Sequence, residues 1–328
     1  MSAPSSHHPP LRCVLLGAGR IGWSYDGGAY DGTRSVSHAA CYDRHPDTQL
    51  VGVFEPDEDA RSAFAAGYRG PGSPRISGDL EEILGLAPDC VSVCSPSQHH
   101  AGQIDRLLGS EARYLWIEKP VTLSLAEHES LLAKWRATGR KQRIAVNYLR
   151  RGLPQYDVLR EAARDGAPVA VHATYSRGLD VNGVHMLDQI GAVLGRTDAP
   201  ELDWIDAANS DNPSFGFTSD GTSVTVTGMD LPYHCIELSV ILPDRRLSVI
   251  RGGLELRDEP VEANPDYPGF YHLGPPQPGP QAGLYREAML DGTYRNLCSL
   301  LDDTVEPPST LETSLFAARL LDRVAARR

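Results

Sequence analysis

The chain has 328 residues, of which 41% are hydrophobic and 23% are charged, a composition that fits two globular domains and excludes an intrinsically disordered protein. A formal net charge of −12 argues against nucleic acid or an anionic membrane surface as a partner. No uncharged apolar run approaches the roughly 18 residues of a membrane helix. The first ten residues lack the basic start and apolar core of a signal peptide, so we expect a disordered lead-in over residues 1–10 and a cytoplasmic protein.

The six cysteines are scattered, and the sequence contains no C-x-x-C pair. Cys13, Cys90 and Cys94 lie in apolar, strand-like runs, which is typical of small buried thiols in a reducing compartment. A zinc site is not expected.

The first half of the chain alternates short apolar runs with helical patterns. A capping box is expected at the start of one helix, with Ser124 as the cap and Glu127 three residues on, and Gly139 follows its end. Strands that alternate with helices predict a doubly wound parallel sheet, so we assign residues 11–147 to a Rossmann domain. The strands are expected over 11–16, 50–54, 90–94, 114–118 and 143–148, and helices over 59–66, 98–108 and 124–138.

The second half, residues 148–328, has a different pattern. A helix over 154–164 and a strand over 169–176 precede a helical stretch within 178–195. Three strands, 223–230, 234–242 and 246–256, then follow with only turns between them, which favours an antiparallel sheet. A proline- and glycine-rich connection over 272–283 leads to two expected helices, the last of them capped by Ser309 with Glu312.

The sequence GAGRIG directly follows the first strand and fits the dinucleotide pattern G-x-G-x-x-G. In that pattern the first glycine permits a tight turn, the second lets the pyrophosphate approach the backbone, and the third lets the helix pack on the strand. The helix N-terminus then supplies N–H groups to the phosphates. The candidate cofactor residues of this turn are Gly17, Gly19, Arg20, Ile21 and Gly22; the alternative is a glycine-rich turn without a ligand.

Glu55 follows the second strand, where an acidic residue binds the adenosine ribose. Its charge would repel a 2′-phosphate, so NAD is favoured over NADP. Glu55 lies farther from the glycine turn than usual because of an insertion over 23–35, which is either a lid over the nicotinamide or a surface loop.

Two further stretches end the next strands at the edge where ligands bind in open α/β sheets. SPSQHH supplies Ser95, Pro96 and His100, and EKP supplies Glu118 and Lys119. A lysine near the nicotinamide can hydrogen-bond a substrate oxygen; the alternative is a surface lysine.

In GLDVNGVHMLDQIGAVLG, residues 178–195, His185 and Asp188 share one face of the expected helix. Three interpretations are open: a metal pair, a histidine hydrogen-bonded at a helix start, and a catalytic pair. Two ligands are too few for the metal interpretation. An imidazole suits proton transfer to and from a hydroxyl near neutral pH.

Together, LLGAGRIG, S-P-S-x-x-H, EKP, NYLRR and G-V-H-M-L-D resemble the glucose–fructose oxidoreductase, inositol dehydrogenase and MocA family of NAD(P)-dependent oxidoreductases. The resemblance covers residues 11–195. It implies a Rossmann domain followed by an α/β domain with a large open, mainly antiparallel sheet, whose exposed face pairs subunits into a homodimer or homotetramer.

The resemblance also implies roles for individual residues. Lys119 becomes the catalytic lysine, His185 the general acid/base, and Asp188 a contact to a substrate hydroxyl. Many members have an aspartate four residues before the histidine, where this chain has Val181, so Asp180 or Asn182 is expected to orient the substrate instead.

Several side chains beside this stretch are candidates for holding a carboxylate or phosphate of the substrate. These are Arg150, Arg151 and Arg177, with solvent-exposed salt bridges as the alternative, and Tyr148 and Tyr175, with core packing as the alternative.

The sequence therefore predicts an NAD-dependent oxidoreductase acting on a ring carbinol or ketone of a sugar, cyclitol or nucleotide-linked sugar. A non-catalytic NAD-dependent sensor on the same fold is the competing class, and a non-sugar substrate also stays open.

Overall fold

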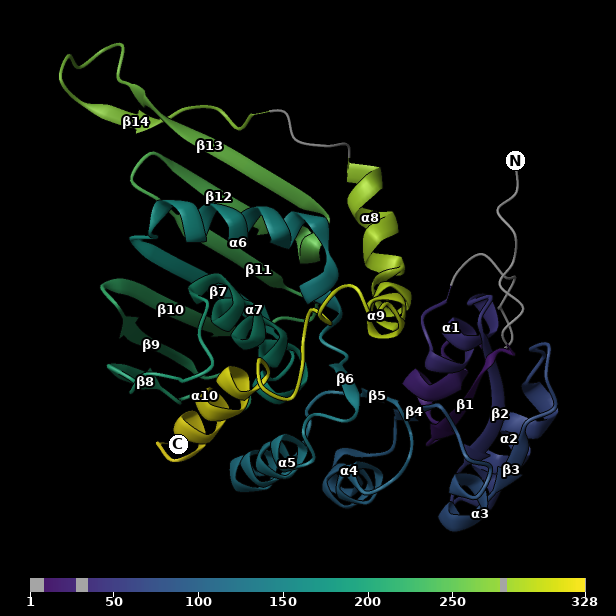
Figure 1. Cartoon of the computed structure of the whole chain (residues 1–328). Coiled ribbons are helices and arrows are strands. Elements are labelled where there is room, and N and C mark those ends of the chain that lie inside the picture. The colour runs from purple at the N-terminus through teal and green to yellow at the C-terminus, as the bar shows by residue number, and fades with distance from the viewer. Residues whose placement is uncertain (1–8, 28–34, 278–281, 328) are drawn as a thin grey trace. The chain divides into compact units, whose positions relative to one another are not determined.

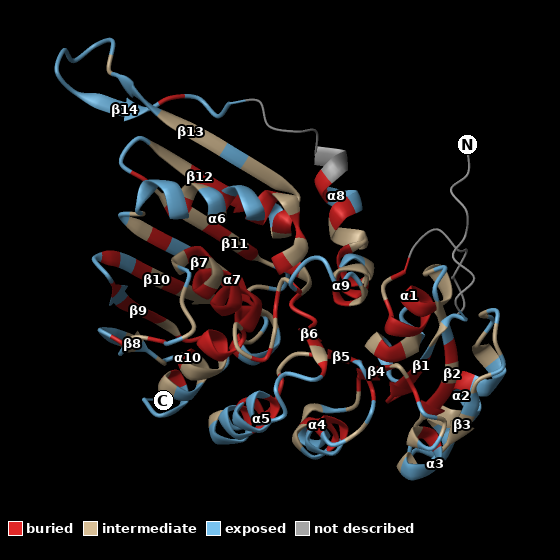
Figure 2. Ribbon diagram, in the orientation of Figure 1, coloured by how far each residue is buried: buried red, intermediate tan, exposed pale blue. Residues whose placement is uncertain are grey.

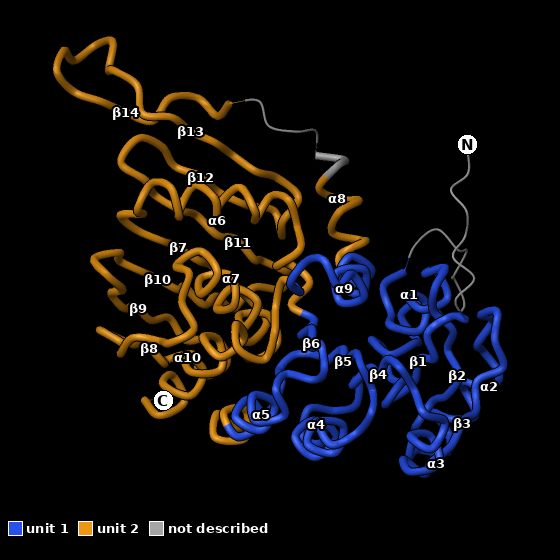
Figure 3. Tube along the Cα trace, viewed as in Figure 1, with its two compact units in different colours: residues 1–122, 130–147, 293–307 blue, residues 123–129, 148–292, 308–328 orange. Residues whose placement is uncertain are grey.

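The computed structural model describes residues 9–27, 35–277 and 282–327, and the chain forms two compact units (Figures 1 and 3). Unit 1 comprises residues 1–122, 130–147 and 293–307, and unit 2 comprises residues 123–129, 148–292 and 308–328. The expected division after residue 147 coincides with one of the places where the chain passes between the units. The return of residues 293–307 to unit 1 was not anticipated.

The sheet of unit 1 is parallel throughout, with the strand order β3-β2-β1-β4-β5-β6 of a doubly wound fold. The strands β4 and β5 are buried along their whole length (Figure 2), as expected for parallel strands covered by helices on both faces. The predicted Rossmann sheet is confirmed. Its strands are β1 (Leu11–Leu16), β2 (Thr48–Phe54), β3 (Arg75–Ser77), β4 (Cys90–Val93), β5 (Tyr114–Ile117) and β6 (Arg143–Val146).

Several helices of this unit begin at side-chain caps. Ser37, Asp57 and Asp79 accept hydrogen bonds from first-turn amides, and the amide of Glu127 donates to the Ser124 hydroxyl at 3.4 Å, as the expected cap requires. The helices are α1 (His38–Arg44), α2 (Glu58–Gly67), α3 (Leu80–Leu84), α4 (His100–Leu108), α5 (Leu125–Ala137), which begins in unit 2, and α9 (Gly292–Leu301).

The glycine turn is followed by less helix than expected. A single π-type turn covers Arg20–Ser24, and α1 starts only at His38. Asp26 is buried and accepts hydrogen bonds from the amides of Val36 and Ser37 and from the Ser37 hydroxyl, which closes the insertion at its base. Residues 28–34 of the expected lid lie outside the described residues, as do residues 1–8 of the lead-in.

Helix α9 completes the core of unit 1 although it comes late in the chain. Leu297 and Leu300 are fully buried in the same apolar cluster as Tyr42 and Trp116. The Arg143 guanidinium at the start of β6 donates to the carbonyl oxygens of residues that end α9, among them Leu300 at 2.8 Å.

The described residues of unit 2 form an eight-stranded sheet in which only β7 and β10 pair in parallel, so the predicted open, mainly antiparallel sheet is confirmed. The order is β14-β13-β12-β11-β7-β10-β9-β8. The strands are β7 (Ala170–Ser176), β8 (Trp204–Asp206), β9 (Ser214–Ser219), β10 (Thr222–Met229), β11 (Ile236–Ile241), β12 (Arg245–Ile250), β13 (Glu255–Ala263) and β14 (Tyr271–Leu273).

The single strand expected over 246–256 is wrong. The chain turns at Arg251–Gly253, where Gly252 and Gly253 adopt φ of +69° and +104°, and this turn separates β12 from β13. Glycine tolerates these angles, which would strain other residues.

In the part of this unit that the structure describes there are four helices: α6 (Pro154–Gly166), α7 (Val184–Leu194), α8 (Ala282–Leu290) and α10 (Leu315–Ala325). Helices α6 and α7 lie on one face of the sheet and α10 packs on α7 (Figure 1). Strand β11 alternates buried Ile236, Leu238 and Val240 with half-buried residues, as expected for a sheet covered by helices on one face.

Two expectations for the C-terminal region are wrong. The described residues contain three helices after the proline-rich connection rather than two. The expected cap at Ser309 does not form: Ser309 is fully buried, and the amides of Thr310 and Thr313 each donate to the other's hydroxyl in the turn before α10, whose own N-cap residue, Ser314, makes no side-chain cap hydrogen bond.

Candidate active site

The glycine turn after β1 lies at the switch point of the unit 1 sheet. A Cβ on Gly17 would lie 2.7 Å from the Ser95 amide nitrogen, and a Cβ on Gly22 would lie 2.2 Å from the Gly17 carbonyl oxygen. Both glycines are therefore required by the packing of backbone on backbone. Gly19 differs, because a Cβ there meets nothing within 4 Å and its φ of −71° suits any residue. The space in front of Gly19 is open to a ligand.

Glu55, at the end of β2, reaches the same turn. One of its carboxylate oxygens accepts a hydrogen bond of 2.8 Å from the Ala18 amide, and the other accepts one of 3.1 Å from the Asp57 amide. The sheet thus brings the expected ribose ligand beside the expected phosphate-binding turn.

His100 links the loops that follow β4 and β5. Its Nδ1 lies 2.9 Å from the Pro120 carbonyl oxygen and its Nε2 lies 2.8 Å from the Ser95 carbonyl oxygen. The ring is 1% exposed. His100 therefore joins the S-P-S-x-x-H and EKP loops by hydrogen bonds from its ring. Its expected contact with a cofactor stays a prediction.

Glu118 of EKP is buried at the end of a chain of hydrogen bonds. It accepts from His38 Nε2 at 3.0 Å, His38 Nδ1 lies 2.9 Å from the Ser92 hydroxyl, and the Tyr42 hydroxyl lies 2.6 Å from Ser92. Burial lowers the pKa of His38 and works to raise the pKa of Glu118, but hydrogen bonds from His38 and Asn147 and the charge of Lys119 hold the pKa of Glu118 below its usual value. The pair is therefore a neutral imidazole and an ionised carboxylate.

The ionised Glu118 also supports Lys119. Its second oxygen accepts from the Lys119 amide at 3.3 Å. On the far side, Asn147 donates to Glu118 and accepts from Asn296 of α9 at 2.9 Å. His38 stacks on Trp116 with ring centroids 3.6 Å apart.

Sequence reasoning did not single out the residues around Glu118. His38, Ser92 and Asn296 come from α1, β4 and α9, and nothing in their local pattern marks them as partners of EKP. The run SVSHAACY, with a histidine among small residues at a capped helix start, was the one available signal.

The residues of unit 1 fit a dinucleotide. The open backbone at Gly19, the carboxylate of Glu55 and the loops after β4 and β5 all follow the carboxyl ends of neighbouring parallel strands, which is where open α/β sheets bind ligands. The predicted cofactor residues are therefore brought together.

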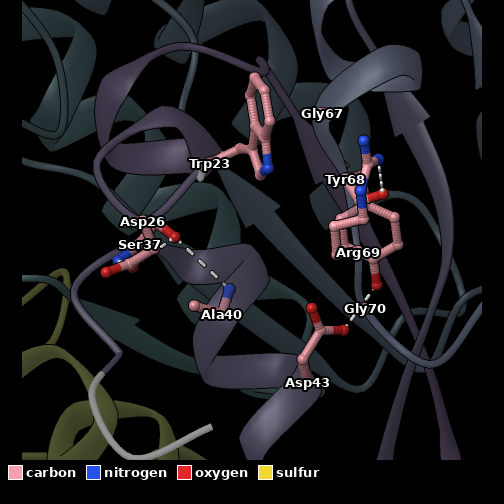
Figure 4. A pocket seen from close by; sticks show the side chains of 10 residues that line it. Trp23, Asp26, Ser37, Ala40, Asp43, Gly67, Tyr68, Arg69 and Gly70 are labelled. Carbon is pink, nitrogen blue, oxygen red and sulfur yellow. Dashed lines mark hydrogen bonds between the residues drawn. The ribbon is translucent and has the colours of Figure 1, made fainter. Parts of the chain in front are cut away.

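A separate hollow of about 390 Å³ lies in the same unit, between the insertion, α1 and the end of α2 (Figure 4). Its described lining includes Trp23, Asp26 and Asp43 but none of the glycine-turn residues or Glu118. The Tyr68 hydroxyl donates to Asp43 at 2.6 Å, and burial raises the pKa of Asp43 to about 6. This hollow is not the expected cofactor site.

In unit 2 the stretch 178–195 folds as expected at its C-terminal end. A π-type turn over Leu179–Gly183 precedes α7, which starts at Val184, ends at Leu194 and is capped by Gly195 with φ of +64°. His185 lies in the first turn of α7, is 8% exposed, and meets the Tyr148 ring edge to face at 5.8 Å between centroids.

Asp188 lies one turn further along and is bound by Arg151. Arg151 donates to its two carboxylate oxygens at 2.7 and 3.0 Å and to its main-chain carbonyl at 3.0 Å. Burial raises the pKa of Asp188, and the guanidinium groups of Arg151 and Arg160 oppose the rise. The salt bridge considered for Arg151 is thus real but buried rather than exposed, and substrate contacts by Arg151 or Asp188 would have to share these groups.

The other expected substrate residues lie in different surroundings. Tyr175 is fully buried and donates to the Pro213 carbonyl at 2.7 Å, which matches the core-packing alternative rather than a substrate contact. Asn182 donates to the Ser176 carbonyl and lies 3.3 Å from His234 Nε2. Asp180 and Arg177 are exposed.

Within the described residues no three His, Cys, Asp or Glu side chains are grouped so as to hold a metal ion. The helices of that same part of the chain are too short or too polar to cross a bilayer.

Comparison with known proteins finds a family match for the first part of the chain. Residues 11–148 match the model of the oxidoreductase family with an NAD-binding Rossmann fold, GFO_IDH_MocA. The resemblance to that family is confirmed over these residues, which form an NAD-binding domain.

Individual relatives show the same relationship. The chain is 27% identical over 211 residues to a D-glucoside 3-dehydrogenase of Escherichia coli (strain K12), a match that covers 57% of this chain and 54% of that protein. The chain thus aligns with about half the length of this curated relative.

Two solved structures share the fold of the whole chain. A dehydrogenase (MviM) from Clostridium difficile has a TM-score of 0.70 at 15% identity and covers 97% of this chain and 99% of its own. A UDP-N-acetylglucosamine 3-dehydrogenase, GnnA, from Acidithiobacillus ferrooxidans has a TM-score of 0.68 at 19% identity and covers 97% and 98%.

Proposed function

We propose that this protein oxidises a ring carbinol of a sugar or cyclitol with NAD, or reduces the corresponding ketone. The observation that carries the proposal is the placement of EKP. Lys119 follows β5 at the same edge of the sheet as the glycine turn, with β4 between β5 and β1, and its main chain is held by an ionised, buried Glu118. A lysine supported in this way at the ligand-binding edge of an NAD-binding sheet has a role beyond solvation.

The proposed chemistry divides between two side chains. When bound, NAD takes the hydride that leaves the carbinol carbon. His185 takes the hydroxyl proton as general base, and the Lys119 ammonium stabilises the negative charge that develops on the same oxygen. In the reverse direction His185 returns the proton to the ketone oxygen. Both roles follow from the family resemblance and require both groups to reach one oxygen.

We further propose NAD rather than NADP as the cofactor. Glu55 places a carboxylate beside the Ala18 amide of the glycine turn, and Asp57 and Glu58 follow it, so a 2′-phosphate would meet like charge. The E. coli relative acts at position 3 of a D-glucoside, as its name states, and this supports a secondary ring hydroxyl such as C3 as the reacting position. A homo-oligomeric state and a cytoplasmic location stay predictions.

The test is to follow nicotinamide absorbance with glucosides, cyclitols, sugar acids and sugar nucleotides, using NAD and NADP in turn. We expect turnover with NAD, loss of at least about a hundredfold in kcat for His185→Ala because general acid–base catalysis is removed, and unchanged NAD affinity. Lys119→Met should behave similarly, and His128→Gln, a buried histidine outside the proposed site, serves as the matched control. Equal activity of wild type and His185→Ala would refute the assignment.

A further inference from the structure

Arg150 is a buried cation for which the described part of the chain supplies no counterion. It lies on the short helical turn Leu149–Gly152 and is 6% exposed. Among the described residues no carboxylate forms an ion pair with it, and its Nε is buried without a hydrogen-bond partner. Burying a guanidinium in this way is unfavourable, so buried arginines are normally paired.

The next residue provides the contrast. Arg151 is just as buried, but its charge is neutralised by two hydrogen bonds to the Asp188 carboxylate. Of the two adjacent arginines, Arg150 therefore has the uncompensated charge.

The surroundings of Arg150 are rich in donors and poor in negative charge. The Tyr156 hydroxyl is buried beside Arg150, and the charge of the guanidinium and a hydrogen bond from it oppose the rise in the pKa of Tyr156 that burial causes. The carboxylate that acts on Tyr156 is that of Glu237, which accepts from the Arg251 amide at 3.3 Å and forms no ion pair with Arg150.

A second cation and a histidine complete the cluster. Burial lowers the pKa of His234, and the charges of Arg150 and Arg177 lower it further, so both arginines lie near this ring. Arg177 is exposed and adopts φ of +67°, a left-handed conformation that residues other than glycine, asparagine and aspartate rarely take. Such a conformation is often kept where a side chain is used.

The cluster lies beside the proposed acid/base. The turn that carries Arg150 packs against α7, and Tyr148, two residues earlier, meets His185 ring to ring. Asn182, three residues before His185, contacts His234.

We propose that Arg150, with Tyr156, Arg177 and His234, binds an oxyanion carried by the substrate, either a carboxylate or a phosphoryl group. This inference rests on the proposed function, since it names the class of sugar that the site takes: an acidic or nucleotide-linked sugar rather than a neutral one. The anion supplies the counterion that Arg150 lacks.

The test measures binding to the NAD-saturated full chain by calorimetry at low salt. The probes are D-glucuronate, UDP-glucose, inorganic phosphate and, as the neutral control, D-glucose. We expect glucuronate or UDP-glucose to bind at least about tenfold more tightly than glucose, a difference that vanishes in Arg150→Met and is partly restored in Arg150→Lys. Preference for glucuronate assigns the site to a carboxylate, and preference for UDP-glucose assigns it to a phosphoryl group.

Thermal unfolding adds a readout that does not depend on turnover. Without ligand, Arg150→Met should unfold at the same temperature as wild type or higher, because an unpaired buried charge is removed, and it should lose the stabilisation by phosphate. Arg136→Met, a variant at an exposed arginine in unit 1, should change neither.

The outcomes separate this inference from the proposed function. If neutral glucosides are oxidised with NAD and no probe binds in an Arg150-dependent way, the anion site is refuted and the oxidoreductase stands. If the anions bind through Arg150 and no sugar is turned over, the anion site stands and the proposed activity fails.

Discussion

The ion pair between Arg151 and Asp188 gives the sharpest stability prediction. The two side chains are 9% and 1% exposed, and three hydrogen bonds of 2.7–3.0 Å join Arg151 to Asp188. Arg151→Met leaves the carboxylate buried and unpaired, because the nearby Arg160 donates to Asp157 and to the Arg151 carbonyl. Breaking a buried pair in this way costs about 3–5 kcal/mol of unfolding free energy.

The loss of unfolding free energy in Arg151→Met should depend on pH. In Arg151→Met the pKa of Asp188 rises further above that of the unfolded chain, so the folded variant binds a proton that the unfolded chain releases. Its stability therefore rises as pH falls through that window, and the gap to wild type narrows from pH 8 to pH 5. Urea unfolding followed by circular dichroism at the two pH values measures this gap.

Two further variants test whether the unpaired Asp188 carboxylate causes the loss of stability. Arg151→Met/Asp188→Leu removes both charges and should recover most of the loss, whereas Arg151→Lys, which cannot make two parallel hydrogen bonds, should lie between wild type and Arg151→Met. A double variant as unstable as Arg151→Met at every pH would refute the reasoning, because the unpaired carboxylate would then not be the source of the loss.

Two further predictions follow from single positions. Gly19→Ala should leave the midpoint of urea unfolding unchanged, because a Cβ there meets nothing, but it should weaken NAD binding by at least about tenfold. Normal NAD affinity in Gly19→Ala would exclude close approach of the cofactor to this backbone. By contrast, Gly17→Ala should destabilise the fold itself, because Gly17 has φ of +101° and a Cβ there would lie 2.7 Å from backbone. Burial lowers the pKa of His128 to about 4, whereas in the unfolded chain this histidine takes up its proton near pH 6.5. The free energy of unfolding should therefore rise by about 3 kcal/mol in total as the pH rises between these values. In urea unfolding at a series of pH values, His128→Gln should remove this pH dependence, and an unchanged dependence in the variant would contradict the prediction.

The main strands of the unit 1 sheet were predictable because each is an apolar run, and such a run indicates a buried strand from the local sequence alone. LRCVLL and CVSVC need no distant partner to be read as strands, and GAGRIG and EKP then take their places at strand ends. Contacts that depend on distant residues were not predictable in this way. Nothing near His38 indicates that its ring meets Glu118, and α9 reads as an ordinary helix of the second half although its leucines fill the first core.

Local signals also fail where two similar residues compete. Ser309 and Thr310 both precede the last helix, and Thr310 rather than Ser309 pairs with the turn that leads into it, because Thr313 supplies the second hydroxyl at the right spacing. Arg150 and Arg151 are equivalent in the sequence, yet only Arg151 meets Asp188, because residues on a helical turn point in different directions. The pairing that decides which arginine is available to a ligand is a property of the tertiary structure.

The late contribution of α9 to unit 1 bears on how the protein is synthesised. All six strands of the parallel sheet have left the ribosome once Val146 emerges, but Leu297 and Leu300, which fill their core, and Asn296, which binds Asn147, follow only after about half of the chain more has been made. During translation the apolar core of the NAD-binding unit therefore stays incomplete until α9 has been made. A fragment ending at residue 147 would expose the apolar surface that α9 covers. We expect the nascent chain to depend on chaperones and that fragment to fail to accumulate in cells.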